Sequence, residues 1–327
     1  MSRVKSLHEA AIEEYEYQEL IRSGQIIPSN TGFTFLNESL LGGTNTSDIL
    51  TISGLSSAGK STFANELSYN LATLNQGVRV LIMSYEVPGR KLAAKKISFN
   101  IKKSLREMYT DKAPIDRKHF EIFEKVPIDV IEIPINVNQI AKVIDEYCNK
   151  YHNDRVHIIF DHTLLVDNLR GESDMETLVS LANFCNKTKK KYNIVYILVS
   201  QLNDSMLKPV RLSNPSGHFP NQTDIFGARA IYHVSDCVIA LVMPSRLQLP
   251  MVNGKQFYGL PKLPLTITRT KQNNTSYKQN LIYVHSIKTR DSNPRIDPLI
   301  DNLKYSQLLE FKNKDLIAFN NKYKINT

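Results

Sequence analysis

Residues 54–61 match the phosphate-loop pattern G-x-x-x-x-G-K-[ST], which is typical of proteins that bind nucleoside triphosphates. Glycines in such a loop let backbone N–H groups face the phosphates, and the N-terminus of the following helix adds partial positive charge. Lysine then reaches the β- and γ-phosphates, while the last hydroxyl binds Mg²⁺. We therefore expect a nucleoside triphosphate and Mg²⁺ to be held by Gly54, Ser57, Ala58, Gly59, Lys60, Ser61 and Thr62.

The segments around this loop have the composition that a phosphate loop requires. An apolar, β-rich run precedes it at 49–53, and apolar residues at helical spacing follow it at 62–74. This alternation continues along the chain and predicts an α/β fold with a parallel sheet and crossover helices. Strands are expected at 78–84, 128–133, 156–160 and 194–199, and helices at 88–101, 137–147 and 175–190.

Three polar side chains follow predicted strands and are candidates for chemistry on the triphosphate. Asp161 ends an apolar strand and would bind Mg²⁺. Glu86 could polarise an attacking water, and Gln201 could sense the γ-phosphate. Ligands of open parallel sheets bind at the carboxyl ends of the strands, where all three lie. Taken singly, an aspartate after an apolar strand is common, and a glutamate there can be a solvated surface group.

Composition places the chain among soluble globular proteins. Apolar residues make up 42% and charged residues 22% of its 327 residues, and no apolar run is long enough for a membrane helix or a signal peptide. We therefore expect a cytoplasmic protein without a membrane partner. The net charge of +9 permits binding to a polyanion. Three isolated cysteines are expected to be buried, reduced thiols.

Both ends of the chain differ from its middle. Residues 1–30 contain a Glu-rich amphipathic helix, and its apolar positions Leu7, Ala11, Tyr15 and Leu20 need either their own domain or a neighbouring subunit to pack on. Residues 31–290 are expected to form the ATPase domain. After about residue 291 the strand signal is lost, so 291–327 is predicted to be a C-terminal extension with one helix at 306–320.

The motifs together resemble the ATPase domain of DnaB-like replicative helicases, the hexameric RecA-fold helicases of superfamily four. The similar segments follow the family's order. They are Thr31-Gly32-Phe33-Thr34-Phe35-Leu36-Asn37 for the lead-in, Gly42-Gly43, the phosphate loop, Ser84-Tyr85-Glu86-Val87 for "SLEM", Asp161-His162-Thr163-Leu164-Leu165 for "DYLQL", Ser200-Gln201-Leu202-Asn203 for "SQLN", and 224–238 for "sDLR…DADvv".

This resemblance implies a RecA-like core, a mostly parallel twisted sheet flanked by helices, preceded by a short docking helix. It implies ATP hydrolysis with Mg²⁺, with Glu86 as general base and Gln201 as γ-phosphate sensor. It further implies 5′-to-3′ translocation on single-stranded DNA, a hexameric ring, and primase or a loader as partners. Arg269 and Lys271 would reach the nucleotide of the neighbouring subunit. A compact protein of this kind fits a phage, acting in the host cytoplasm.

Two loops correspond to the family's DNA-contacting loops, at 168–173 and 203–222. The cations Arg170, Lys208 and Arg211 would contact phosphates, and the Phe219 ring would stack on a base.

The sequence also departs from the family pattern. Phe226 replaces the "DLR" arginine, the basic pair near the end has its identities exchanged, and 30 residues stand before the lead-in where the family's helicases carry a separate N-terminal domain. Two alternatives therefore stay open: a RecA- or KaiC-like ATPase that does not unwind DNA, and a nucleotide-binding structural or adaptor protein.

Overall fold

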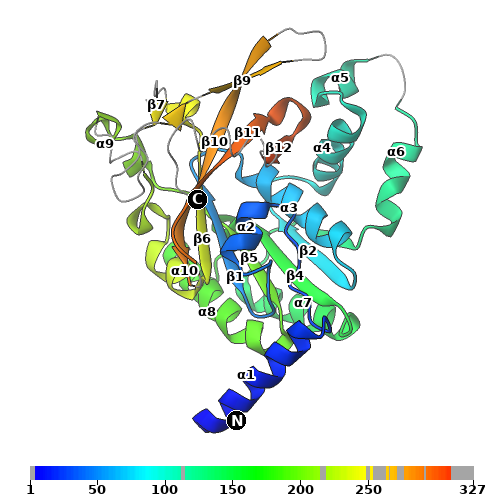
Figure 1. Ribbon diagram of the computed structural model, residues 1–327, viewed down its shortest axis with the longest axis vertical. Helices are drawn as coiled ribbons and strands as arrows, with labels where there is room; N and C mark the ends of the chain where they lie inside the picture. Colours follow the sequence, from blue (N-terminus) through cyan, green and yellow to red (C-terminus); the bar gives the residue numbers. More distant parts are fainter. Residues whose placement is uncertain are drawn as a thin grey trace.

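One large sheet organises the computed structural model, which describes residues 4–111, 115–213, 219–247, 251–252, 263–264, 266–270, 276–290 and 292–310. Its strand order is β12-β11-β10-β6-β1-β5-β4-β2-β3, with β9 paired to β10 (Figure 1). The six strands from β6 to β3 are parallel, and β10, β11 and β12 extend the sheet in antiparallel fashion. A separate pair joins β7 and β8. The strands are β1 Ile49–Gly54, β2 Val78–Ser84, β3 Ile128–Ile131, β4 Arg155–Asp161, β5 Val195–Val199, β6 Cys237–Val242, β7 Met251–Val252, β8 Leu263–Pro264, β9 Thr266–Thr270, β10 Ser276–Thr289, β11 Ile296–Asn302 and β12 Gln307–Glu310.

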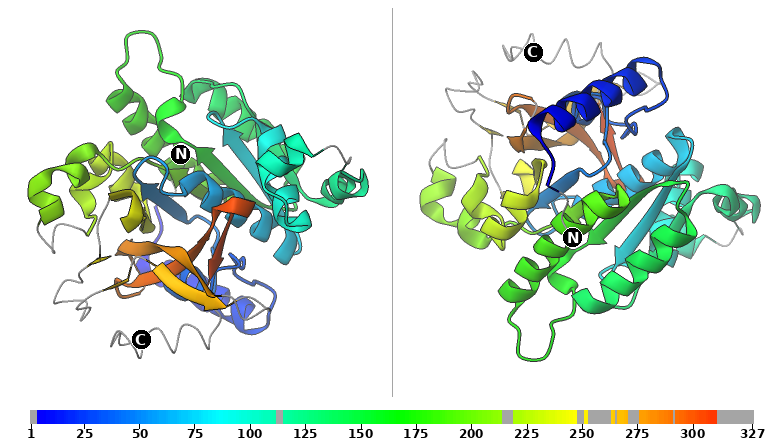
Figure 2. Two further views of the ribbon diagram at one scale, coloured as in Figure 1. Left: turned by 90° about the horizontal axis from the view of Figure 1, so that it is seen from above. Right: turned by 90° about the horizontal axis from the view of Figure 1, so that it is seen from below.

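Helices cover both faces of this sheet (Figure 2). Side chains of α2, α3 and α4 pack on one face, and those of α7, α8 and α10 pack on the other. The α-helices are α1 Leu7–Arg22, α2 Thr34–Ser39, α3 Lys60–Leu74, α4 Gly89–Ile101, α5 Leu105–Thr110, α6 Lys118–Glu121, α7 Val137–Lys150, α8 Asp174–Tyr192, α9 Pro209–Ser213 and α10 Ala228–Val234.

Alternation along the buried strands explains why both faces need a cover. In β2, Val80 and Ile82 point to the α3 side, whereas Leu81 and Met83 point to the α7 side. Strands buried on both faces read as continuous apolar runs, as the central segments do. The predicted α/β class with a mostly parallel sheet is confirmed, and the strand predicted at 78–84 coincides with β2.

The sheet continues past residue 291, so the prediction that strand structure ends there is wrong. β11 pairs with β10, and β12 pairs with β11. β11 contains Pro298 and buried Asp297, both unusual in strands, which hid the signal. Asp297 is tolerated because Arg295 donates two hydrogen bonds of 2.7 Å to its carboxylate. The start of the helix predicted at 306–320 is instead β12, and its remainder lies outside the described residues.

The N-terminal helix is present as predicted. In α1, Ser6 and Glu9 form a capping box, which satisfies backbone N–H groups at the helix start. The helix extends away from the body of the domain (Figure 1), and none of its residues is buried. A hydrogen bond of 3.3 Å from the Tyr17 hydroxyl to Asn45 links it to the domain. Its apolar residues therefore have little cover within the described chain.

A buried ion pair fixes α4 on α3. Lys96 lies 3.1 Å from Glu66, and the Lys96 ammonium also lies over the Tyr69 ring, 3.9 Å from its centroid. Ion pairs this buried are stable only when both partners are present, so the pair sets how the two helices meet. Because α4 follows directly after β2, this contact also determines what α4 presents to the carboxyl end of the sheet.

Candidate nucleotide site

The phosphate loop turns between β1 and α3. Its conformation places Ser57 and Gly59 at positive φ, 61° and 96°, and only glycine adopts such angles without strain. Gly54 allows a close approach, because an added Cβ would lie 3.0 Å from the Leu241 carbonyl oxygen and 3.2 Å from Lys60 Cγ. The loop ends at the N-terminus of α3, where unpaired N–H groups favour an anion. This backbone fits a polyphosphate.

Lys60 lies folded against its own loop. Its Nζ donates a 2.9 Å hydrogen bond to the Leu55 carbonyl oxygen. Burial lowers the pKa of Lys60, and the nearby carboxylates of Glu86 and Asp161 partly oppose that shift. A half-buried ammonium that donates to a carbonyl oxygen can exchange this partner for a charged phosphate oxygen, which makes the stronger hydrogen bond.

Asp161 ends β4 and faces the start of α3. Its side chain is 3% exposed, and its Oδ1 accepts a 3.1 Å hydrogen bond from the Ser61 hydroxyl. Burial raises the pKa of Asp161. Carboxylate and hydroxyl oxygens are the protein ligands that Mg²⁺ prefers when phosphates and waters complete its shell, so this pair fits the ion. The described residues contain no cluster of three or more His, Cys, Asp or Glu side chains suited to a metal.

Glu86 lies two residues beyond the end of β2. The Tyr85 N–H donates a 3.0 Å hydrogen bond to the Asp161 carbonyl oxygen, which holds the two strand ends together. The Glu86 side chain is 55% exposed, and its Oε2 lies 3.9 Å from His162 Nε2. Burial lowers the pKa of His162, so the imidazole is mostly uncharged at neutral pH. The Glu86 carboxylate therefore has no strong cationic partner in the imidazole and remains open to solvent.

Sequence reasoning did not single out Lys95. This lysine lies half-buried in the second turn of α4. Burial lowers its pKa, while the charges of Asp161 and Glu86 act in the opposite direction, so its ammonium belongs to the same site. The sequence did contain a signal for Lys95, namely the helix predicted directly after Glu86. Because β2 pairs with parallel strands, the chain must cross back over the sheet after Glu86, so the first turns of this helix start at the edge where Glu86 lies.

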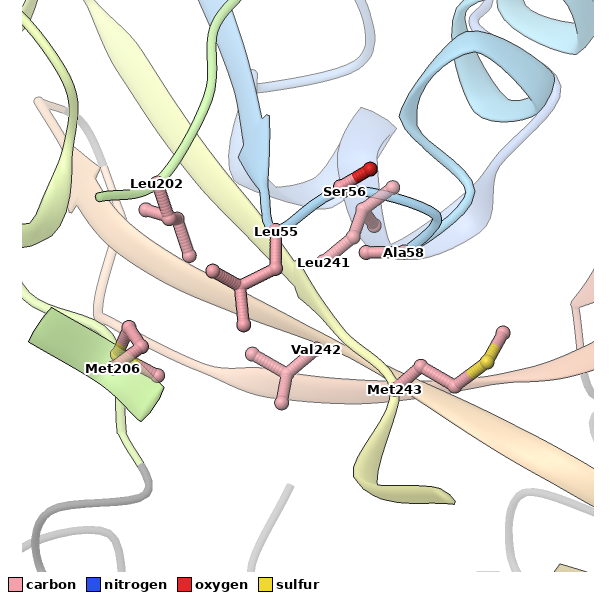
Figure 3. A pocket seen from close by; sticks show the side chains of 8 residues that line it. All are labelled: Leu55, Ser56, Ala58, Leu202, Met206, Leu241, Val242 and Met243. Carbon is pink, nitrogen blue, oxygen red and sulfur yellow. The ribbon is translucent and has the colours of Figure 1, made fainter. Parts of the chain in front are cut away.

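Gln201 lies just past β5, between the strand ends that carry the phosphate loop and Asp161. Its carbonyl oxygen accepts a 2.8 Å hydrogen bond from the Phe226 N–H, and Leu202 N–H donates to the Gly54 carbonyl oxygen at 3.1 Å. Leu55, Leu202 and Met206 close over β6 around a small apolar cavity of about 10 Å³ (Figure 3). The phosphate loop thus packs against the segment that follows Gln201.

The residues predicted to contact DNA differ in how exposed they are. Arg170 and Lys208 are exposed. Arg211 instead forms an ion pair with Asp224, in the segment where a plain loop was expected and where short helical turns are found. Phe219 is 2% exposed and packs edge-to-face on His285, with ring centroids 5.1 Å apart. In this arrangement its ring is covered and is not positioned to stack on a base.

The basic pair predicted to act between subunits is only partly described. Arg269 lies on β9, where its backbone pairs with Tyr277 of β10. Lys271 lies outside the described residues.

Comparisons with known proteins agree on one fold. Residues 29–275 match the family model of the DnaB-like helicase C-terminal domain. A solved ATPase domain aligns over 95% of this chain and 100% of its own, with a TM-score of 0.73 and 17% identity. A DnaB-like replicative helicase, described with its interactions with primase, aligns over 95% of this chain and 68% of its own, with a TM-score of 0.70 and 17% identity. A KaiC-like protein from Pyrococcus horikoshii OT3 aligns over 88% and 100%, with a TM-score of 0.51 and 15% identity.

No curated protein matches the chain. Within the described residues, no helix has the length and apolar content to cross a membrane.

The burial of Asp161 should make the nucleotide-free protein less stable, although ATP turnover requires this carboxylate. Its pKa is higher in the folded than in the unfolded chain, so the folded state binds more protons between the two values and loses stability as pH rises through them. Asp161→Asn removes this charge and should stabilise the nucleotide-free protein at pH 7 while abolishing ATP turnover. Urea unfolding at several pH values tests this. The gain should shrink below about pH 4, near the unfolded pKa of aspartate, and a variant less stable than wild type at pH 7 would contradict it.

Proposed function

Because the chain belongs to the DnaB-like helicase C-terminal domain family, we propose that it couples ATP hydrolysis to 5′-to-3′ translocation on single-stranded DNA and unwinds duplexes. The observation that supports this most is the arrangement of four neighbouring parallel strands, β1, β5, β4 and β2. At their carboxyl ends lie the phosphate loop, Gln201, Asp161 and Glu86 in turn. A nucleotide on the loop would meet a metal ligand, a base and a sensor at one sheet edge.

Each of these side chains has a role that its environment suits. The loop amides and Lys60 would bind the phosphates, and Ser61 with Asp161 would hold Mg²⁺. When bound, Mg²⁺ would neutralise charge on the phosphate oxygens. Glu86 would accept a proton from the attacking water, and Gln201 would report the γ-phosphate to the following segment. Lys95, whose ammonium interacts with the charges of Asp161 and Glu86, would offer a further cation beside the bound phosphates.

ATP turnover should depend on the loop lysine and on the carboxylate of Glu86 in different ways. Lys60→Ala should abolish tight nucleotide binding. Glu86→Gln keeps size and polarity but cannot accept the proton, so binding should persist while turnover falls by roughly 10²–10⁴-fold. Equilibrium binding of a fluorescent ATP analogue and steady-state phosphate release measure the two properties. Wild-type turnover in the Glu86→Gln protein would remove Glu86 from the mechanism.

The proposed DNA contacts rest on exposed cations near the same sheet edge. Lys208 follows the segment that packs on the phosphate loop, and Arg170 lies in the loop before α8. Both side chains are exposed and so available to backbone phosphates. The fold is also similar to that of a KaiC-like protein, so unwinding needs its own test.

Single-stranded DNA should stimulate ATP turnover, and the protein should displace a strand from a duplex with a 5′ single-stranded tail. Affinity for a labelled oligonucleotide should fall linearly on a log–log plot against salt, because bound lysines and arginines release counterions. A duplex with a 3′ tail is the control for direction. DNA-stimulated turnover without strand displacement would favour the non-unwinding ATPase. No DNA binding at low salt with ATP analogue present would favour a structural protein.

We also propose that the chain assembles into a ring through α1. A groove of about 180 Å³ lies between α3, α4 and the edge strand β3, and its lining includes Tyr69, Leu92, Phe123 and Val130. The exposed apolar side chains of α1 match it in character. The charges also match: α1 carries five glutamates and one arginine, whereas α4 presents the exposed cations Arg90 and Lys91 and contains no acidic residue. A second copy of α1 is therefore a suitable occupant.

Deleting residues 1–27 should leave a folded ATPase domain that assembles weakly, since no residue of α1 is buried in the chain itself. Val130→Glu, which places a charge at the groove, should weaken assembly in the same way, whereas Lys142→Ala on exposed α7 surface should not. Analytical ultracentrifugation with ATP analogue measures this. Unchanged oligomers in both the deletion and the Val130→Glu variant would refute the docking.

Such a ring would place two further proposed contacts. Arg269 and Lys271 would meet the nucleotide of the neighbouring subunit. Partial return of activity in mixed rings of Lys60→Ala and Arg269→Ala/Lys271→Ala subunits tests that role, and no return in rings shown to be mixed contradicts it. One solved relative is described with its interactions with primase, and co-sedimentation with a purified primase tests whether this chain shares that partner.

A further inference from the structure

The carboxylate of Asp224 is the centre of a buried polar network. It is fully buried, and both of its oxygens accept hydrogen bonds from the terminal nitrogens of Arg211. The distance from Arg211 Nη2 to Asp224 Oδ2 is 3.0 Å. The Ser205 hydroxyl donates to it at 2.9 Å and the Asn221 N–H at 2.8 Å. A buried carboxylate is stable when its oxygens are satisfied in this way. One side chain therefore holds Ser205, Arg211 and Asn221 together.

The backbone of the same region connects Asp224 to the nucleotide site. Asn203 N–H donates a 2.7 Å hydrogen bond to the Asp224 carbonyl oxygen, and Phe226 N–H donates to the Gln201 carbonyl oxygen at 2.8 Å. Between these bonds, Leu202 and Ile225 form an antiparallel bridge. Leu202 N–H in turn bonds the phosphate loop at the Gly54 carbonyl oxygen. An unbroken series of contacts thus runs from Arg211 to the phosphate loop.

Apolar packing reinforces this series. Met206 lies in the turn η3 Asp204–Leu207, and it meets Leu55 of the phosphate loop across the small cavity shown in Figure 3. Arg211 also donates a 2.9 Å hydrogen bond to the Phe219 carbonyl oxygen, and the Phe219 ring covers His285 of β10. Arg211 therefore contacts both Ser205 and Phe219, which lie on either side of it in the sequence.

The guanidinium of Arg211 forms its hydrogen bonds within the protein. Its side chain is 20% exposed, and its terminal nitrogens already serve Asp224, Ser205 and Phe219. We propose that Arg211 and Asp224 form a positioning pair that transmits DNA contact at residues 203–213 to Gln201 and the phosphate loop. Arg211 itself is then no DNA ligand. This inference rests on the proposed coupling of ATP turnover to single-stranded DNA.

The geometry and charge of the Arg211–Asp224 pair predict that removing either partner has the same effect. A planar guanidinium meets both carboxylate oxygens at once, whereas a lysine ammonium is a point charge and cannot hold the same geometry. Removing either partner leaves the other buried without its counter-charge. Arg211→Ala and Asp224→Asn should therefore share one phenotype, although one removes a cation and the other an anion. A DNA-phosphate contact would give them opposite effects.

The test measures ATP turnover with and without a saturating oligonucleotide, and the salt dependence of oligonucleotide affinity. In Arg211→Ala and Asp224→Asn, DNA-stimulated kcat should fall roughly 3- to 30-fold, with the KM for ATP, DNA-free turnover and the salt slope close to wild type. Lys208→Ala, at an exposed cation of the same segment, should instead reduce the salt slope by about one and keep stimulation at saturating DNA. Lys142→Ala on α7 is the neutral control.

Opposite results overturn the proposal. If Arg211→Ala reduces the salt slope by about one while Asp224→Asn keeps full stimulation, Arg211 is a DNA contact. Thermal unfolding checks that the variants fold; if they do not, Arg211→Lys decides, since loss of stimulation supports positioning and full stimulation contradicts it. Wild-type protein without any DNA stimulation would refute the proposed function itself, which distinguishes the two failures.

Discussion

Parallel pairing between β2 and β4 sets Ser84 opposite Asp161, and the nucleotide site is a consequence of that register. The same direction holds through β5 and β1, so four chain segments that are far apart in sequence end at one sheet edge. A slip of one residue in any of these strands would turn each of its side chains to the opposite face. Because both faces are packed against helices, such a slip would exchange the side chains of the two cores, and neither core would keep its packing. Burial therefore fixes the register, and the register fixes the site.

The charges of the site are arranged at a cost to the free protein. Lys60 and Lys95 both have lowered pKa values from burial, and the pKa of Asp161 is raised for the same reason. Burial disfavours the charged form of each group, and each would gain a partner when a metal–triphosphate complex is present. Binding of the ligand would therefore stabilise charged groups that the free protein stabilises only in part. The phosphate loop adds to this, since Ser57 adopts a positive φ that a serine rarely takes.

Sequence patterns predicted the parts of the fold in which local and global signals agree. The strand β2 and the helices α1 and α7 were predicted from their apolar residues alone, and each is present at the predicted place. β11 could not, because Pro298 and Asp297 argue against a strand, and only pairing with β10 and the Arg295 guanidinium make them acceptable. Among candidate site residues, motif spacing identified those at strand ends. The pairing of Arg211 with Asp224 and the burial of Phe219 depend on how a polar segment folds back on itself, which no local pattern encodes.

We propose that this sheet edge binds ATP and communicates with DNA through the segment that follows Gln201. Cryo-electron microscopy of the protein with a non-hydrolysable ATP analogue, Mg²⁺ and single-stranded DNA tests it most directly. We expect the triphosphate on residues 54–61, Mg²⁺ beside Ser61 and Asp161, DNA against Lys208, and Arg211 still paired with Asp224. Nucleotide bound elsewhere, or DNA phosphates in contact with Arg211 in place of Asp224, would contradict it.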